Sequence, residues 1–144
     1  DLLDRVYAAL AAVPGADVIK LLNHRLVGFS CVATSQMGDH IGRAAHGPWG
    51  SAACYAVTHR GAERLAAGLR VMEFPYDVAL ERGWASATHL YAMRPNVTQL
   101  QKQPSTIASR SVYRASKFPW WRRLGTLATR TAETIRRASY ALKG

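Results

Sequence analysis

Cysteine, acidic residues and long apolar runs are all scarce in this chain of 144 residues. Its two cysteines, Cys31 and Cys54, are isolated and lack the spacing of metal ligands, and so few thiols are typical of the reducing cytoplasm. No apolar run approaches the roughly 18 residues that a bilayer span needs. The N-terminal residues also lack the pattern of a secretory signal. These absences argue against an integral membrane protein and a disulfide scaffold, and they predict a cytoplasmic protein.

Basic residues, by contrast, are abundant and unevenly distributed. The first 109 residues contain ten Lys/Arg and eight Asp/Glu, whereas the last 35 contain nine and one. Nearly all of the net charge of +10 therefore lies in the C-terminal quarter. The composition, 49% hydrophobic and 19% charged, is ordinary for one globular domain. We divide the chain into a nearly neutral body, residues 1–110, and a basic amphipathic tail, residues 111–144.

Hydrophobic periodicity in the first half of the chain predicts a helix followed by strands. Residues 1–13 have apolar side chains at helical spacing, and Pro14-Gly15 ends that helix. Residues 17–22 are apolar on both faces, as in a buried strand, and the apolar residues 26–33 are a second strand candidate. The polar, glycine-containing residues 34–48 are predicted to form a loop.

In the second half, strands and helices alternate. Thr58 has the side chain of a helix N-cap, and Gly83 is expected to end a short helix. The alternation of the two element types predicts an α/β fold. The predicted elements are a strand over 52–57, helices over 59–69 and 75–82, a strand over 88–93, and a C-terminal helix that follows residues 117–123 and continues to about residue 142.

Three short blocks in the body are recognisable. The first is YAVTHRGAERL (residues 55–65), the second is PYDVAL (75–80), and the third combines Tyr91 with PNVTQ (95–99) and STI (105–107). In this order and spacing they resemble blocks of glycosyltransferase family 25, which includes the lipopolysaccharide and lipooligosaccharide glycosyltransferases. The resemblance covers the whole body of the chain.

The resemblance implies a GT-A-like nucleotide-sugar fold and a hexosyltransferase reaction. The family transfers a hexose, such as galactose from UDP-galactose, to a lipopolysaccharide-type saccharide, with Mn2+ or a similar divalent ion as cofactor. Asp77 falls on the aspartate position of the second block, so the resemblance implies that it is catalytic and accepts the proton of the acceptor hydroxyl. The alternative is that Asp77 only stabilises the positive end of the helix that it begins.

Four further residues are candidates for substrate binding. Tyr55 follows the small residues 50–53, which either leave room for a ligand or allow tight strand packing. His59 lies at a helix start, where free amide groups attract phosphate, or it is a solvated surface residue. Gln99 and Ser105 match the closing block, so the resemblance implies contacts with acceptor or sugar hydroxyls.

The sequence departs from the family in one respect. Family members have an acidic cluster that holds the metal and the nucleotide-sugar diphosphate, yet this chain contains no two adjacent acidic residues. Asp39, His40 and His46 have the residue types of metal ligands, but their spacing fits no ligand pattern, so we predict no metal site in the chain. By the resemblance, the cluster lies just upstream of Asp1. The chain is then the acceptor-side part of the domain, which alone is not expected to be active.

The basic tail has its own explanations. Residues 117–143 combine tryptophans and leucines with arginines, as in an amphipathic helix that lies on an anionic membrane surface. Such a helix suits a lipid-linked acceptor at the inner membrane. The alternative is a helix that packs on the body with a solvated basic face. Nucleic-acid binding is a rival reading of the same residues, but without a known motif for it no nucleic-acid partner is expected. A non-catalytic peripheral membrane module is therefore the second hypothesis for the chain.

Overall fold

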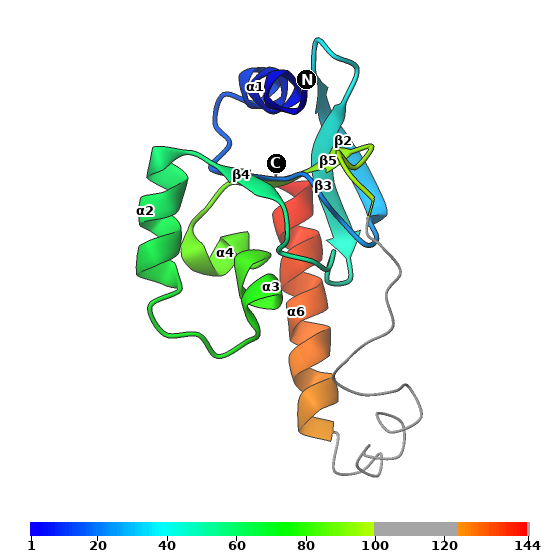
Figure 1. Ribbon diagram of the computed structural model, residues 1–144. Helices are drawn as coiled ribbons and strands as arrows, with labels where there is room; N and C mark the ends of the chain where they lie inside the picture. The colour runs from blue at the N-terminus through cyan, green and yellow to red at the C-terminus, as the bar shows by residue number, and fades with distance from the viewer. Residues whose placement is uncertain (100–123, 144) are drawn as a thin grey trace.

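The computed structural model describes residues 1–99 and 124–143, which form a mixed α/β structure (Figure 1). Its five strands form one sheet in the order β2-β3-β5-β1-β4, in which β1 and β5 are parallel and the other neighbours are antiparallel. The α/β class predicted from the sequence is confirmed. The helices are α1 (Leu2–Ala12), α2 (His59–Gly68), α3 (Tyr76–Leu80), α4 (Gly83–Ser86) and α6 (Leu124–Leu142). The strands are β1 (Val18–Lys20), β2 (Val27–Thr34), β3 (His40–His46), β4 (Tyr55–Val57) and β5 (Leu90–Arg94).

Alternating side chains along the two parallel strands build a core on each face of the sheet. Ile19, Tyr91 and Met93 pack with α1 in one cluster, whereas Val18 and Leu90 pack with α2 and α3 in the other. Figure 1 shows α1 on one side of the sheet and the remaining helices on the other. Because helices cover both faces of the sheet, all three residues of β1 are buried, as its sequence predicts.

The predicted loop over residues 34–48 is wrong, because these residues contain β3. The strand pairs with β2 in an antiparallel hairpin. Its centre holds a glycine and a buried arginine, which do not signal a strand. A Cβ atom on Gly42 would overlap the Ser30 carbonyl, so the close approach of the two strands requires glycine. Arg43 is buried and its Nε donates to the Leu90 carbonyl at 3.2 Å.

Local signals place most helix boundaries correctly. Thr58 caps α2, with its Oγ1 accepting from the Gly61 amide at 3.1 Å, as predicted. The role predicted for Gly83 is wrong, because α3 ends at Leu80 and Gly83 begins α4. A Cβ atom on Gly83 would overlap the Tyr140 hydroxyl, so the glycine there makes room for α6 rather than ending a helix.

The C-terminal helix ends at Leu142, as predicted, and its last turns pack on the body. The Tyr140 hydroxyl accepts from the Leu90 amide at 2.7 Å and donates to the Thr88 carbonyl at 2.6 Å. The first turns extend beyond the other elements in Figure 1. The boundary predicted between body and tail lies outside the described residues. Among the helices of the described ranges, none has the length and apolarity to cross a membrane.

Candidate functional site

The candidate site lies where the parallel strands β1 and β5 end. In open α/β sheets, ligands bind beyond the carboxyl ends of the parallel strands. Here β1 ends at Lys20, which pairs with Tyr55 of β4 on one side and with Ala92 of β5 on the other. Beyond the strands, the Asn23 amide donates to Asn96 Oδ1 at 3.1 Å, and Asn96 Nδ2 donates to the Asn23 carbonyl at 2.8 Å. These bonds fix the two connections relative to each other.

Lys20 is fully buried and belongs to a polar cluster at this end of the sheet. Its Nζ donates to Glu81 Oε1 at 2.5 Å and to the Gly50 carbonyl at 2.8 Å. Glu81 accepts at Oε2 from the Trp49 amide at 2.8 Å and from Arg137 Nη1 at 3.4 Å. Two cations therefore share one buried carboxylate. Burial lowers the pKa of Lys20, although the charge of Glu81 opposes that effect.

Asp77, the residue predicted to be catalytic, lies near this cluster. It is half-buried in the first turn of α3, and its Oδ1 accepts from the Val78 amide at 2.9 Å. Burial lowers the pKa of Lys20, and the charge of Asp77, after that of Glu81, opposes this lowering. The local sequence determines the position of Asp77, because Pro75 has φ −51° and ψ 146° and directs the chain into the helix. Asp77 thus adds a partly accessible carboxylate near the buried Lys20.

Two tyrosines link the start of α3 to β4. The Tyr55 and Tyr76 hydroxyls are hydrogen-bonded at 2.8 Å. Burial, with this hydrogen bond as the second cause, raises the pKa of Tyr76 to about 12. Tyr76 is therefore protonated at neutral pH and can both donate to and accept from a hydroxyl-rich ligand. The structure brings Tyr55 and Asp77 to the same end of the sheet through Tyr76, which directly precedes Asp77 in α3.

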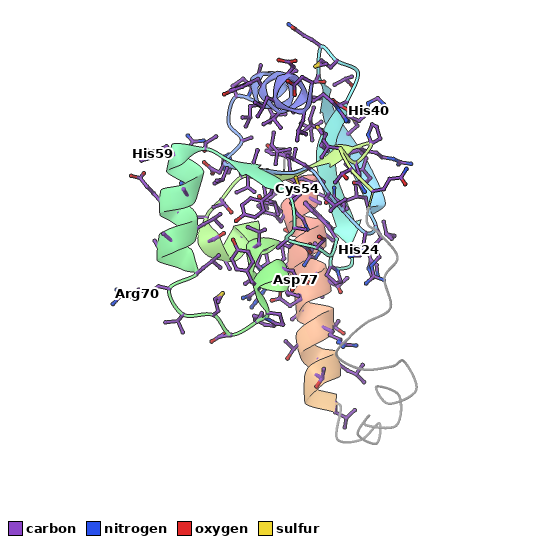
Figure 2. The ribbon with its side chains drawn as sticks, viewed as in Figure 1. His24, His40, Cys54, His59, Arg70 and Asp77 are labelled. Atoms are coloured by element: carbon purple, nitrogen blue, oxygen red, sulfur yellow. The ribbon has the colours of Figure 1, made fainter. Side chains whose placement is uncertain are left out.

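His59 lies at the opposite end of the sheet from Asp77. Because β4 runs antiparallel to β1, the helix that follows β4 begins at the amino end of β1. The His59 side chain is 92% exposed and lies 3.3 Å from Glu63. Figure 2 shows His59 at the left, Asp77 in the centre and His24 at the right. The structure does not bring His59 to the candidate site, and its surroundings match the solvated-surface alternative.

The two residues of the closing block have different outcomes. Gln99 is exposed and follows β5 on the carboxyl side of the sheet. Ser105 lies outside the described residues. Neither residue is therefore tied to Asp77 by a described contact.

Sequence reasoning missed the buried cluster of Lys20, Glu81 and Arg137. One signal was present, because Lys20 interrupts the apolar run VIKLL of residues 18–22. A charged residue in a strand that is buried on both faces requires a buried partner. Glu81 lies 61 residues after Lys20, and Arg137 lies 56 residues after Glu81. No local sequence pattern therefore identifies either partner.

The residues present do not fit the divalent ion that the family resemblance implies. In ranges 1–99 and 124–143, no three His, Cys, Asp or Glu side chains are grouped so that they could hold a metal. Asp39 is buried and accepts from Arg5 at 2.6 and 3.1 Å, whereas His40 and His46 lie at opposite ends of β3. Both cysteines are free thiols.

Comparison with known proteins found no matching family model, no matching curated protein and no matching solved structure. The site geometry and the resemblance of the three sequence blocks are therefore what a functional proposal can use.

Proposed function

We propose that this chain forms the acceptor side of a GT-A-like glycosyltransferase domain of the family 25 type. The reaction transfers a hexose, galactose from UDP-galactose, to a lipopolysaccharide-type saccharide. One observation carries the proposal: the hydrogen bond between Tyr55 and Tyr76 joins the first and second sequence blocks and places Asp77 at the carboxyl end of β1. Two blocks that are separate in sequence thus meet at the end of the sheet where α/β proteins bind ligands.

In the proposed reaction, the Asp77 carboxylate accepts the proton of an acceptor hydroxyl while the hydroxyl oxygen bonds to the anomeric carbon of the hexose. The bond from that carbon to the nucleoside diphosphate breaks, and the diphosphate leaves with the electron pair. The excess of positive charge in the buried cluster of Lys20, Arg137 and Glu81 attracts a negative group at this position. The Tyr55 and Tyr76 hydroxyls are placed to hold the saccharide.

The edge of the sheet next to the site supports the proposal. Strand β4 is only three residues long and is the last strand of the sheet, with β1 as its one neighbour among the described residues. Its outer backbone groups are free to pair with a further strand. The family's acidic, diphosphate-binding cluster is not among these 144 residues.

The test is the Asp77→Asn substitution in the protein as its gene encodes it. The amide keeps the size of the side chain but is not a base, so the transfer rate is expected to fall by about 10²- to 10⁴-fold. The measurement is transfer of labelled galactose from UDP-galactose to truncated lipopolysaccharide, with kcat and KM determined separately. A variant that retains full transfer removes Asp77 from the mechanism.

Glu73→Gln is the matched control, because Glu73 is an exposed carboxylate four residues before Asp77. It is expected to transfer galactose at the wild-type rate, and circular dichroism should show both variants folded. If the unsubstituted protein neither transfers nor hydrolyses any nucleotide sugar, the proposed function is wrong.

A peripheral membrane module is the second candidate, and α6 provides the observation in its favour. Four apolar side chains of the helix are exposed by 47% to 84%. Their spacings of three, eight and seven residues place them on one face of the helix, which does not include the buried Arg137 and Ala141. Arg137 was expected to face lipid headgroups but instead bonds to Glu81 inside the body. The exposed side chains, which we call the apolar stripe, are Leu124, Leu127, Ile135 and Leu142.

A further inference from the structure

A second feature at the carboxyl ends of β1 and β5 is a cavity of about 360 Å³. One wall is the connection that follows β1, and the other is the end of β5 with the two residues after it. The volume falls in the range of about 300–1,000 Å³ that is usual for small-molecule sites. We call it the basic cavity, and it is lined by Asn23, His24, Arg25, Leu26, Arg94, Pro95 and Asn96.

The lining of the basic cavity carries positive charge without a matching acid. Arg25 and Arg94 are two of its seven lining residues, and none of the seven is Asp or Glu. In the described part of the chain neither arginine forms an ion pair. Arg25 Nε donates to the Pro48 carbonyl at 3.2 Å, which orients its guanidinium group. Guanidinium groups bind phosphate and carboxylate through two parallel hydrogen bonds, so an anion matches this lining.

Asn23 offers an independent sign of a ligand with hydroxyl groups. It is 5% exposed, and its Oδ1 accepts no hydrogen bond from any described residue. Its Nδ2 donates to the Met93 carbonyl at 3.3 Å, and because a carbonyl can only accept, the amide orientation is fixed. A buried acceptor without a donor is costly. Asn23 lines the basic cavity but its Oδ1 has no exposed surface, so a ligand hydroxyl supplies the donor after a shift of the side chain.

The basic cavity is connected to the candidate site through packed residues. His24 lies against Gly50, where a Cβ atom would approach the His24 ring to 2.8 Å. The carbonyl of Gly50 accepts from Lys20 at 2.8 Å, and Lys20 lies near Asp77. The basic cavity and Asp77 therefore adjoin the same end of the sheet.

We propose that the basic cavity binds the anionic group, a phosphate or a carboxylate, of a saccharide, with Arg25 and Arg94 on the anion and Asn23 on a hydroxyl. That this saccharide is the acceptor of the transfer reaction depends on the proposed function above. Binding itself does not depend on it. The chain would thus select acidic sugars over neutral ones.

The test measures binding of glucose 6-phosphate, glucuronate, glucose and inorganic phosphate by isothermal titration calorimetry. Glucose 6-phosphate, glucuronate or both are expected to bind, and glucose is expected to bind at least about ten-fold more weakly. The variants Arg25→Gln and Arg94→Gln should each weaken binding of the acidic sugar by about ten-fold, because each removes a charged hydrogen-bond donor. Arg70→Gln is the matched control, since Arg70 is an exposed arginine after α2, on the other side of the molecule (Figure 2).

Three results would overturn the proposal. The first is equal affinity for glucose and glucose 6-phosphate, and the second is unchanged affinity in both arginine variants. The third is an affinity for inorganic phosphate as high as that for glucose 6-phosphate, which would indicate an anion site without sugar recognition. The calorimetric readout requires no transfer. Binding with no transferase activity therefore contradicts only the proposed function, whereas transferase activity without binding contradicts only the basic cavity.

Discussion

At the scale of single residues, Asp17 shows how a buried charge is held. It lies immediately before β1 and is fully buried. Its carboxylate accepts from Arg60 Nε at 2.7 Å, Arg64 Nη1 at 2.6 Å and the His89 amide at 2.8 Å. Burial alone would raise the pKa of Asp17, but the hydrogen bonds from His89, Arg60 and Arg64 lower it below its ordinary value of 3.8. Asp17 therefore ties α2 and β5 to the start of β1.

The Asp17→Asn substitution is expected to lower the free energy of unfolding by about 2 kcal/mol at neutral pH, because charged hydrogen bonds are lost while the arginines remain partly solvated. A carboxyl group whose pKa is lower in the folded state stabilises the fold fully above pH 3.8. That contribution disappears as the pH falls through the folded pKa. Urea unfolding at several pH values checks both statements.

In that experiment the variant should lose stability less steeply than the wild type below pH 3.8. Asp4→Asn is the control, since the Asp4 side chain is 68% exposed, and its unfolding should follow the wild type. A variant with the wild-type acid profile would show that Asp17 does not carry this pH dependence.

The start of α2 shows why single residues were only partly predictable. The sequence correctly places a helix start at Thr58 and basic residues after it, which is the pattern of an anion site. The anion that this end of the helix meets is Asp17 of the same chain, 43 residues before Arg60. Nothing in the local sequence distinguishes an internal carboxylate from a bound phosphate.

At the scale of elements, the docking of α6 depends on a buried charge rather than on apolar contacts alone. In α6 the buried residues are Arg137 and Ala141. Arg137 bonds to Glu81, which also holds Lys20. Burial lowers the pKa of Arg137, against the opposing effect of Glu81. Helix α6 is therefore joined to β1 through one carboxylate.

Glu81→Gln removes that carboxylate charge and leaves two buried cations without it. The expected loss is about 3–5 kcal/mol of unfolding free energy, the usual effect of removing one partner of a buried pair. Glu133→Gln is the matched control, because Glu133 pairs with Arg82 at 3.0 Å where both side chains keep some exposure, and its loss should be about 1 kcal/mol. Urea unfolding followed by circular dichroism gives both values. Equal losses would contradict the assigned role of Glu81.

Helices and strands were predicted correctly where apolar residues recur at regular spacing, and they were missed where tertiary contacts determine the residue types. The helices α1 and α2 have apolar faces at helical spacing, and both were located from the sequence. Strand β3 was not, since Gly42 and Arg43 occupy buried positions that apolar residues usually fill. The reasons for both residues lie in neighbouring strands, which the sequence alone does not position.

At the scale of the whole molecule, the candidate site gathers residues from segments far apart in sequence at the carboxyl ends of β1 and β5. The sequence predicted Asp77 and Tyr55 through their blocks, but it could not show that they share one end of the sheet, nor that His59 lies at the other. That arrangement follows from the antiparallel pairing of β4 with β1. Pairing direction is a long-range property, so the site geometry required the fold.

The apolar stripe of α6 is a second exposed feature of the molecule. Helix α6 buries Arg137 and Ala141 against the body and exposes the apolar stripe, and it also carries the exposed Arg130 and Arg136. An amphipathic helix binds an anionic bilayer by burying its apolar side chains in the interface, while its arginines attract the lipid headgroups. Cosedimentation with vesicles is therefore expected for phosphatidylglycerol-containing lipids and not for pure phosphatidylcholine.

The double substitution Leu127→Glu and Ile135→Glu should weaken this cosedimentation by at least about ten-fold, since it removes apolar area and adds repulsive charge. Both side chains are exposed, so the fold is expected to be unchanged. Val71→Glu is the control: Val71 is 81% exposed on the connection after α2, and the same change there should leave binding intact. Wild-type binding that persists in the double variant would show that the stripe is not the contact. If the double variant still transfers the hexose to a soluble acceptor, α6 serves as the membrane anchor and the body as the catalytic part. This outcome is expected because the stripe lies on α6, whereas Asp77 lies on α3.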